Sequence, residues 1–248
     1  NSSKFLKVVA AIQARMGSTR LPGKVLKKIC GKTIIEIIAE RLRSAKRLDD
    51  IVLAIPSNKA NDPLAQEGQR LHLKVFRGSE IDIVSRLQGA LELTGASAVV
   101  RVTADCPFID PDTIDHVIAV FKKNPRRYDY LGNVFQRTYP DGLDTEIFTA
   151  SILKELAHRL KTPLERELLS TYVNSNWPPQ KIYNLQFKKD LSRVRLTLDY
   201  PEDLELLSLI YTELSKISPI FKLNSILDFI AKNPSILRIN EKWITDRT

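Results

Sequence analysis

Cysteine is scarce in this chain, and long apolar runs are absent. The 248 residues contain only Cys30 and Cys106, which lie far apart and lack the paired spacing of zinc ligands. This pattern argues against a disulfide framework or a structural metal and favours a reducing, cytoplasmic setting. No apolar run approaches the roughly 20 residues of a membrane span, and no signal-peptide pattern is present. We therefore expect no membrane partner.

Signatures of nucleic-acid binding are also absent, although the chain is basic. It carries 38 Lys and Arg against 29 Asp and Glu, a formal net charge of +9. Such a balance accompanies nucleic acids, anionic membrane surfaces or anionic small substrates. The cations are scattered, their densest run being KKNPRR at 122–127, and no zinc-finger, RRM or basic-zipper pattern accompanies them. We expect no nucleic-acid partner.

The order of secondary structure predicts an α/β fold with a doubly wound, mostly parallel sheet. Apolar runs and helix signals alternate along the chain, as in strand–helix–strand units. Strands are expected at 5–13, 50–55, 74–76, 97–103 and 193–198. Helices are expected at 34–45, 61–71, 79–93 and 110–123, from 201, and at 225–232. Thr33 and Asp110 have the positions of helix caps, and Pro111 that of a first helical residue.

The middle of the chain departs from this alternation. Residues 128–189 contain short strand-like pieces, a Pro-Asp-Gly turn at 140–142 and helical patterns at 151–160 and 164–174. We interpret the chain as a single domain, 1–248, whose core at 4–127 and 190–248 is interrupted by an α+β excursion at 128–189. This excursion is a candidate dimer arm.

The stretch ARMGSTRLPGK, residues 14–24, has some features of a phosphate-binding loop. A P-loop needs four residues between its glycines and a Ser or Thr after its lysine. Here five residues separate Gly17 from Gly23, and Val25 follows Lys24. The stretch also lacks the G-x-G-x-x-G of a dinucleotide fold. A P-loop kinase or NTPase is therefore disfavoured.

Charged residues follow three of the predicted strands at the same edge of the sheet, where ligands bind in open parallel sheets. The loop after the first strand carries three cations, Arg15, Arg20 and Lys24, while Asp105 and Asp199 follow the strands ending at 103 and 198. Cations suit a polyanion, and Mg²⁺ takes carboxylate oxygens together with phosphates. An Asp before a helix can also be only a cap. Taken together, the three positions predict a site for Mg²⁺ and a nucleoside triphosphate.

Five stretches, in this order along nearly the whole chain, resemble the cytidylyltransferases that activate acidic sugars. This family includes the CMP-sialic acid and CMP-ketodeoxyoctulosonate synthetases, and the likeness is greatest to its spore coat polysaccharide biosynthesis protein F branch. The stretches are IQARMGSTRLPGK (12–24), VFRGSE (75–80), RVTADCPFID (101–110), RTYPDGLDTE (137–146) and DYPEDL (199–204).

The resemblance implies a fold of the nucleotide-diphospho-sugar transferase type, usually in a homodimer. It implies a Mg²⁺-dependent transfer of CMP from CTP to a sugar acid, with release of pyrophosphate, in surface or spore-coat polysaccharide biosynthesis. CTP and an acidic sugar would be its partners.

The family motifs also imply roles for individual residues. Arg15, Lys24, Asp105 and Asp199 would be catalytic, and the two aspartates would bind the metal. The nucleotide would contact Ala11, Gln13, Arg15, Gly17, Ser18, Arg20, Lys24, Arg77 and Arg101, with Ala11 and Gln13 near the base. The sugar would contact Asp141, Gly142, Asp144 and Glu146.

One position departs from the family pattern. Close relatives tend to have Glu-Arg-Glu-His, whereas this chain has Leu168 at the position of the histidine. The departure bears on the sugar specificity and the activity that the resemblance implies. Two alternatives also stay open beside CTP chemistry, namely the use of another nucleotide and an inactive partner in polysaccharide assembly.

Overall fold

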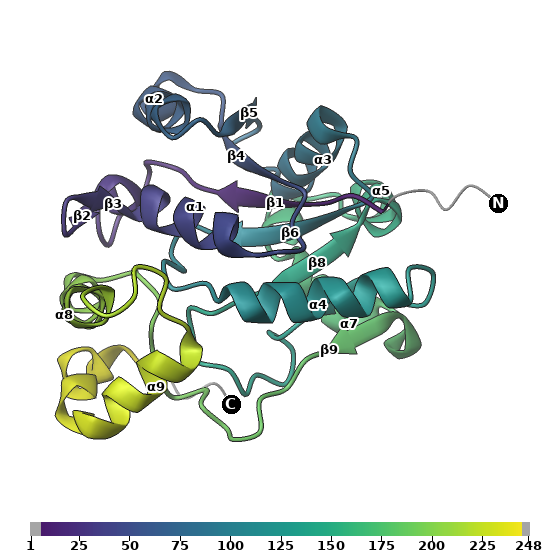
Figure 1. Ribbon diagram of the computed structural model, residues 1–248. Helices are drawn as coiled ribbons and strands as arrows, with labels where there is room; N and C mark the ends of the chain where they lie inside the picture. The colour runs from purple at the N-terminus through teal and green to yellow at the C-terminus, as the bar shows by residue number, and fades with distance from the viewer. Residues whose placement is uncertain (1–5, 245–248) are drawn as a thin grey trace.

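A seven-stranded sheet forms the centre of the protein in the computed structural model, which describes residues 6–244 (Figure 1). The strand order is β5-β4-β1-β6-β8-β7-β9, and β8 runs antiparallel to both of its neighbours while the other adjacent pairs are parallel. This confirms the mostly parallel α/β fold. The strands are β1 (Val8–Gln13), β4 (Asp50–Pro56), β5 (Lys74–Gly78), β6 (Ala98–Thr103), β7 (Tyr130–Gly132), β8 (Glu146–Thr149) and β9 (Ile182–Asn184); β2 (Lys28–Ile29) and β3 (Lys32–Thr33) form a separate hairpin.

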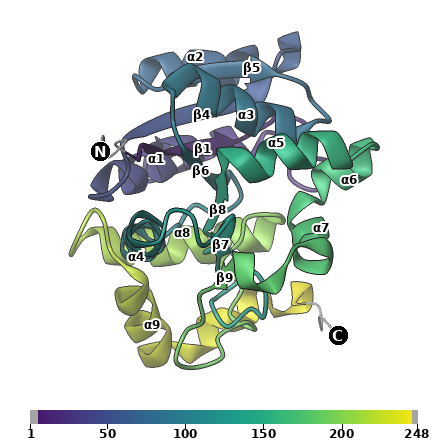
Figure 2. The ribbon, with the colours of Figure 1, turned by 90° about the vertical axis from the view of Figure 1, so that its right-hand side faces the viewer.

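Helices cover both faces of the sheet (Figure 2). One face packs against α1 (Ile34–Ser44), α2 (Asp62–Arg70), α4 (Pro111–Lys123), α8 (Pro201–Ser215) and α9 (Leu223–Lys232). The other packs against α3 (Ile83–Thr94), α5 (Ala150–Arg159) and α7 (Leu169–Asn176), and the short α6 (Pro163–Glu167) precedes α7. Single 3-10 turns lie at Lys24–Leu26, Lys59–Asn61, Pro179–Lys181, Pro234–Ile239 and Glu241–Trp243.

Strand β1 shows why two separate cores form. Its residues are all buried, and successive side chains point to opposite faces of the sheet. Val8, Ala10 and Ile12 therefore belong to one hydrophobic core, and Val9 and Ala11 to the other. A strand buried on both faces is continuously apolar, which made β1 recognisable from sequence.

The predicted caps of α1 and α4 are confirmed. The Thr33 hydroxyl accepts a hydrogen bond from the Glu36 backbone N–H at 3.1 Å, and an Asp110 carboxylate oxygen accepts one from the Thr113 N–H at 2.9 Å. Each bond satisfies a donor that has no partner within its helix.

Residues 128–189 contribute directly to the main sheet. Strand β8 pairs with β6, β7 pairs with β8, and β9 pairs with β7. Helices α5 and α7 of the same segment cover the second face. The segment thus completes the sheet on which the site is built.

Two expectations about secondary structure are wrong. The predicted strand at 193–198 is an extended segment with one isolated bridge, Arg195 to Asp141, because its backbone partners are loop residues. The predicted helix at 164–174 is divided into α6 and α7 at Leu168, whose ψ of 32° departs from helical geometry.

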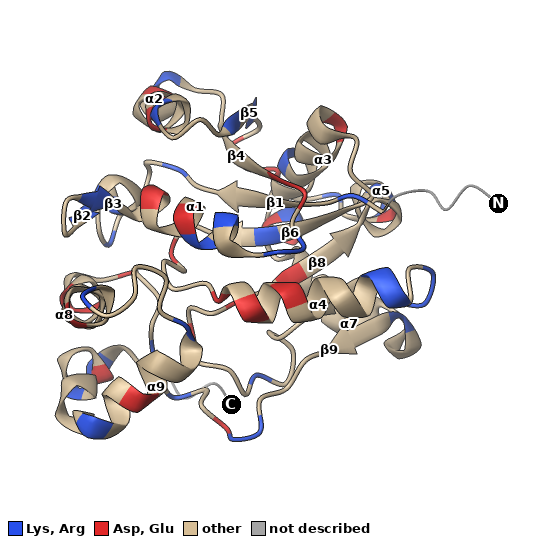
Figure 3. Ribbon diagram, viewed as in Figure 1, with Lys and Arg blue, Asp and Glu red and all other residues tan. Residues whose placement is uncertain are grey.

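Lys and Arg residues are spread over helices, strands and loops along the ribbon (Figure 3). On α4, Asp112 lies in the first turn and Lys122 and Lys123 in the last, which complements the helix dipole.

No helix within residues 6–244 has the length and apolar character needed to cross a membrane.

Candidate active site

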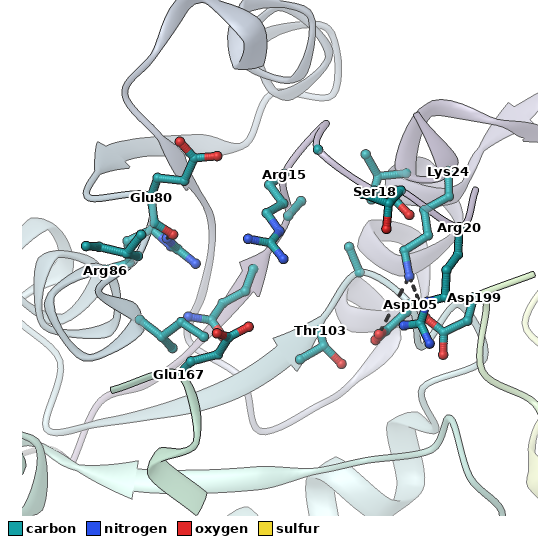
Figure 4. A pocket seen from close by; sticks show the side chains of 18 of the residues that line it. Arg15, Ser18, Arg20, Lys24, Glu80, Arg86, Thr103, Asp105, Glu167 and Asp199 are labelled. Carbon is teal, nitrogen blue, oxygen red and sulfur yellow. Dashed lines mark hydrogen bonds and ion pairs between the residues drawn. The ribbon is translucent and has the colours of Figure 1, made fainter. Parts of the chain in front are cut away.

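The loop that follows β1 forms one wall of a cavity of about 380 Å³ at the carboxyl edge of the sheet (Figure 4). Gly23 has a φ of 63°, a conformation that glycine adopts without strain, and Lys24 then begins a 3-10 turn. Arg15 is exposed and projects into the cavity, where it has no hydrogen-bond or ion-pair partner among the described residues. The loop residues Gly17, Ser18 and Arg20 line the same cavity.

Asp105, Asp199 and Lys24 meet at one end of this cavity. The Lys24 ammonium donates to Asp199 Oδ1 at 2.9 Å and lies 3.8 Å from Asp105 Oδ2. Arg20 contributes a second ion pair to Asp199 at 3.1 Å. Burial would raise the pKa of Asp199, but the attraction of Lys24, Arg20 and Arg195 outweighs this and holds that pKa below its ordinary value. Asp199 is therefore ionised at neutral pH.

Backbone contacts fix Asp199 beside Asp105. The Leu198 N–H donates to the Asp105 carbonyl at 2.8 Å, and the Thr197 hydroxyl donates to the same oxygen at 3.1 Å. On the other side, Asp203 Oδ2 accepts from the backbone N–H groups of Asp199 and Tyr200, both at 2.9 Å. The segment before α8 thus places Asp199 without a regular strand.

A buried ion-pair network stabilises the segment before α8 that carries Asp199. Asp203 is fully buried and receives two hydrogen bonds from the Arg195 guanidinium, at 2.9 and 2.8 Å. Asn240 donates to Asp203 Oδ1 at 2.9 Å and to the Arg195 carbonyl at 3.2 Å. The Tyr200 ring stacks on Trp243. Residues near the C-terminal end therefore hold the Asp199 segment in place.

A second cavity, of about 280 Å³, adjoins the first. We name them after the ligands expected from sequence, the first as the nucleotide cavity and the second as the sugar-side cavity. They share four lining residues, which are Arg101, Thr103, Asp105 and Asp199. The expected sugar contacts Asp141, Asp144 and Glu146 line only the sugar-side cavity, as do Arg137 and Arg195.

The arginines of the sugar-side cavity are all paired. Arg137 donates to both oxygens of Asp144 and lies 3.8 Å from Asp141. Burial would lower the pKa of Arg137. The neighbouring carboxylates of Asp144 and Asp141 outweigh this effect and raise that pKa above its ordinary value. Arg101 donates to Glu146 at 3.0 Å, and Arg195 is paired as described above.

Three expected contact residues line neither cavity. Ala11 is fully buried in the second core, because its side chain lies two residues before the edge of the sheet. Arg77 is engaged by Asp62 and by the backbone carbonyls of Ser57 and Asn58. Gly142 has a φ of 99°, and a Cβ there would lie 2.4 Å from the Leu196 carbonyl carbon. Gly142 thus allows close backbone packing.

Arg86 of α3 is a cavity residue that sequence reasoning missed. It is only 4% exposed and donates to the carbonyls of Ser79 and Glu80. Burial and the nearby Arg15 lower the pKa of Arg86. The available signal was an arginine on the apolar face of an amphipathic helix, between the buried Val84 and Leu87.

Arg137 and Arg195 were also missed as site residues. Arg137 begins one of the motif stretches, and Arg195 alternates with apolar residues at 193–198. In both places an arginine stands beside apolar residues in a segment that is expected to be ordered, and this was a usable signal.

Comparison with protein families gives a match that spans most of the chain. A model described as Cytidylyltransferase matches residues 9–227. Among solved structures, a cytidylyltransferase from Leptospira borgpetersenii superposes with a TM-score of 0.89 at 35% identity, covering 98% of each chain.

Curated relatives agree with this match. MJ1063 of Methanocaldococcus jannaschii is 34% identical and covers 95% of both chains. The spore coat polysaccharide biosynthesis protein SpsF of Bacillus subtilis is 28% identical over 92% of this chain and 95% of its own. An 8-amino-3,8-dideoxy-manno-octulosonate cytidylyltransferase of Shewanella frigidimarina is 32% identical over about half of each chain, 50% and 51%.

Proposed function

The chain belongs to the cytidylyltransferase family, and from this premise we propose that it transfers CMP from CTP to a hydroxyl group of a sugar acid, releasing pyrophosphate. The observation that carries the proposal is the meeting of two cavities at Asp105 and Asp199. A sugar in one cavity could then present its hydroxyl to the α-phosphorus of a nucleotide in the other. Proximity of this kind lowers the barrier by holding the reacting groups in line.

Cations of the nucleotide cavity are suited to the triphosphate. Arg15 is free to form charge-assisted hydrogen bonds, while Arg20 and Lys24 lie beside Asp199. Ser18 lines the same loop, where its hydroxyl accepts from the Leu21 N–H at 3.3 Å. As negative charge develops on the leaving pyrophosphate, these cations stabilise it. The chain's own residues therefore contribute mainly by binding the triphosphate and by stabilising the negative charge that develops on it.

Asp105 and Asp199 are suited to Mg²⁺. Both present carboxylate oxygens, the ligand type that this ion prefers, and one cation, the Lys24 ammonium, already contacts both. Two carboxylates are enough when phosphates and water complete the coordination. Bound there, Mg²⁺ would neutralise phosphate charge during the transfer. Among the described residues no cluster of three metal-ligating side chains occurs. We assign the metal to Asp105 and Asp199 because their carboxylates already share one cation at the meeting point of the two cavities.

The sugar-side cavity suits a hydroxylated acceptor. Its paired arginines and carboxylates, including Asp141, Asp144 and Glu146, offer donors and acceptors in fixed positions. The Shewanella relative is named for a sugar acid and SpsF for polysaccharide biosynthesis. These names support a sugar acid as acceptor and a role in surface or spore-coat polysaccharide assembly.

We also propose that the protein forms a homodimer through the region around α6. Ile81, Leu164 and Leu168 are large apolar side chains with exposed fractions of 59%, 63% and 48%. Ile81 lies two residues before α3, Leu164 lies in α6 and Leu168 follows it, and these two helices are in contact. On this basis we propose that a second copy covers the three side chains together. Light scattering after size exclusion should give twice the monomer mass. A monomer at micromolar concentration would contradict this arrangement.

Calorimetry with CTP, UTP, GTP and ATP in the presence of Mg²⁺ tests the nucleotide. We expect CTP to bind most tightly. Pyrophosphate release is then measured with CTP and a panel of sugar acids, with neutral hexoses as controls. Preference for another nucleotide would favour a nucleotidyltransferase of different specificity. Tight CTP binding without turnover on any sugar acid would favour an inactive partner in polysaccharide assembly.

A further inference from the structure

Trp243 lies in the last 3-10 turn that the structure describes and lines neither cavity. It also lies beyond residue 227, where the match to the cytidylyltransferase model ends. Its ring nevertheless stacks on that of Tyr200, the residue after Asp199, with parallel planes and ring centres 3.5 Å apart. A segment outside the matched region is therefore connected to the site through one aromatic pair.

Tyr200 in turn contacts Arg20, a cation of the nucleotide cavity. The Tyr200 hydroxyl accepts a long hydrogen bond from Arg20 Nη1 at 3.4 Å, and the guanidinium carbon lies 5.1 Å from the centre of the ring. Arg20 Nη2 donates to Asp199 Oδ1 at 3.1 Å. Two successive residues thus hold the guanidinium, and the position of the Tyr200 ring helps to set its direction.

Arg20 depends on such a contact more than Lys24 does. The Arg20 side chain is 54% exposed, whereas that of Lys24 is 14% exposed. A solvated arginine samples many rotamers and loses this freedom when it binds a ligand. A guanidinium that is already held at an aromatic ring has lost part of that freedom beforehand, so less affinity is lost on binding. Tyr200 therefore prepares Arg20 to bind an anion.

Trp243 restrains the Tyr200 ring and not the backbone that carries it. Asp203 accepts hydrogen bonds from the backbone N–H groups of Asp199 and Tyr200, and neither bond involves Trp243. The indole N–H of Trp243 donates to Glu202 at 3.0 Å, which fixes the indole over the Tyr200 ring. Removal of the indole should therefore release the Tyr200 ring while the backbone around it stays in place.

We infer that Trp243 is a positioning residue of the nucleotide site, which stacks on Tyr200 and thereby directs the Arg20 guanidinium toward the triphosphate. Arg20 contacts the phosphates, and Trp243 acts on them only through Tyr200 and Arg20. This inference rests on the proposed binding of a nucleoside triphosphate in the nucleotide cavity. If Trp243 served only to stabilise the chain, its effect on binding would not depend on Arg20.

A double-mutant cycle tests this dependence with Trp243→Ala, Arg20→Ala and the double variant. Calorimetry with Mg²⁺ gives the dissociation constants of CTP and of inorganic tripolyphosphate, which has neither base nor ribose. Trp243→Phe keeps an aromatic ring beside Tyr200 and loses the donor to Glu202. The matched control is Trp177→Phe, the same change at the other tryptophan, which is buried in the second core and lines neither cavity.

Trp243→Ala should weaken tripolyphosphate binding about fivefold, because the ligand must then immobilise Arg20 by itself. Arg20→Ala should weaken it about tenfold through the loss of a charge-assisted hydrogen bond. Adding Trp243→Ala to Arg20→Ala should change binding by less than about twofold. Trp243→Phe should restore binding to within about twofold of wild type, and Trp177→Phe should match wild type. CTP should follow the same pattern.

The cycle also gives the results that would overturn the inference. A loss in Trp243→Ala that persists in full in the Arg20→Ala background overturns it, because the effect would then not pass through Arg20. Unchanged binding in Trp243→Ala overturns it as well. Trp243→Leu, which keeps an apolar side chain without the stacked ring, should give the same cycle and replaces Trp243→Ala if circular dichroism shows that variant to be unfolded.

The two probes separate this inference from the proposed function. A wild type that binds tripolyphosphate but not CTP overturns the proposed nucleotide, while the tripolyphosphate cycle still decides the role of Trp243. A wild type that binds neither probe overturns both.

Discussion

The nucleotide cavity and the sugar-side cavity share a wall but differ in how far their polar groups have hydrogen-bond or ion-pair partners. This shared wall consists of Arg101, Thr103, Asp105 and Asp199. Among the described residues, the first contains groups without partners, namely the Arg15 guanidinium, Gln13 Nε2 and Arg86 Nε. In the second, Arg137 and Arg195 are engaged by carboxylates. Free donors suit a ligand that brings its own negative charge. Paired groups suit a ligand of many hydroxyls, and they also stabilise the fold.

This difference predicts which substitutions reduce binding and which reduce stability. A side chain with no partner contributes little to the free energy of folding, so its removal should mainly weaken ligand binding. A buried paired residue leaves an unpaired charge behind when it is removed. The shared wall should matter most, because both substrates depend on it.

Asp199→Asn should have the largest effect. Loss of one carboxylate at the shared wall removes the proposed metal ligand and a partner of Lys24, and we expect pyrophosphate release to fall about 10³-fold. Asp105→Asn should behave similarly. Asp228→Asn, at an exposed position of α9, is the control. Near-normal turnover in either wall variant would remove the basis for the metal assignment.

Arg137→Ala should mainly reduce stability. It leaves Asp144 without its largely buried cation and Asp141 with Arg195 alone, and we expect a loss of about 3 kcal/mol in the free energy of unfolding. Urea denaturation measures this. Arg159→Ala breaks an ion pair in which both side chains are 45% exposed, so it should cost less than about 1 kcal/mol. Equal losses in the two variants would mean that the sugar-side pairs are no different from surface pairs.

Arg15→Ala should reduce nucleotide binding and leave stability unchanged. We expect the KM for CTP to rise at least about tenfold, since a charge-assisted hydrogen bond to phosphate is lost. The midpoint of thermal unfolding should stay within about 1 °C of wild type. Arg77→Ala, outside both cavities, should leave the KM unchanged, and an equal rise there would contradict the assignment of Arg15.

The smallest expected effect concerns stability in acid. Because the pKa of Asp199 is depressed in the folded protein, its ion pairs contribute stability above its ordinary pKa of 3.8, and this is lost as the pH falls through the lower folded value. The difference in unfolding free energy between wild type and Asp199→Asn should therefore shrink below pH 3.8. If the free energies of unfolding of the two proteins changed in parallel with pH, Lys24 and Arg20 would not stabilise the ionised form of Asp199.

Local patterns were sufficient to predict most of the fold. The apolar run of β1 and the caps Thr33 and Asp110 depend on neighbouring residues, so they can be recognised in a single stretch. The segment 193–198 shows the limit of this reasoning. Its alternation is that of a strand, yet its backbone partners, including Asp105 and Asp141, belong to loops far away in sequence.

The site was predictable only in part for the same reason. Asp105 and Asp199 follow from the rule that ligands bind at the carboxyl ends of strands. Ala11 and Gln13 share a face of β1, but only Gln13 reaches the edge, and where the edge falls depends on the packing of the whole sheet. The network of Arg195, Asp203 and Asn240 joins the segment around α8's start to a residue 37 positions away from Asp203, and no spacing in the sequence indicates it.

The hydrogen bonds from Leu198 and Thr197 to the Asp105 carbonyl also have a consequence for how the chain can vary in length. They join the loop after β6 to the segment before α8, so the two cannot be lengthened or shortened independently. Inserting a residue into either one would shift its aspartate relative to the other. Homologous proteins should therefore tolerate insertions and deletions at exposed turns, such as 125–127, while keeping a constant length in these two segments.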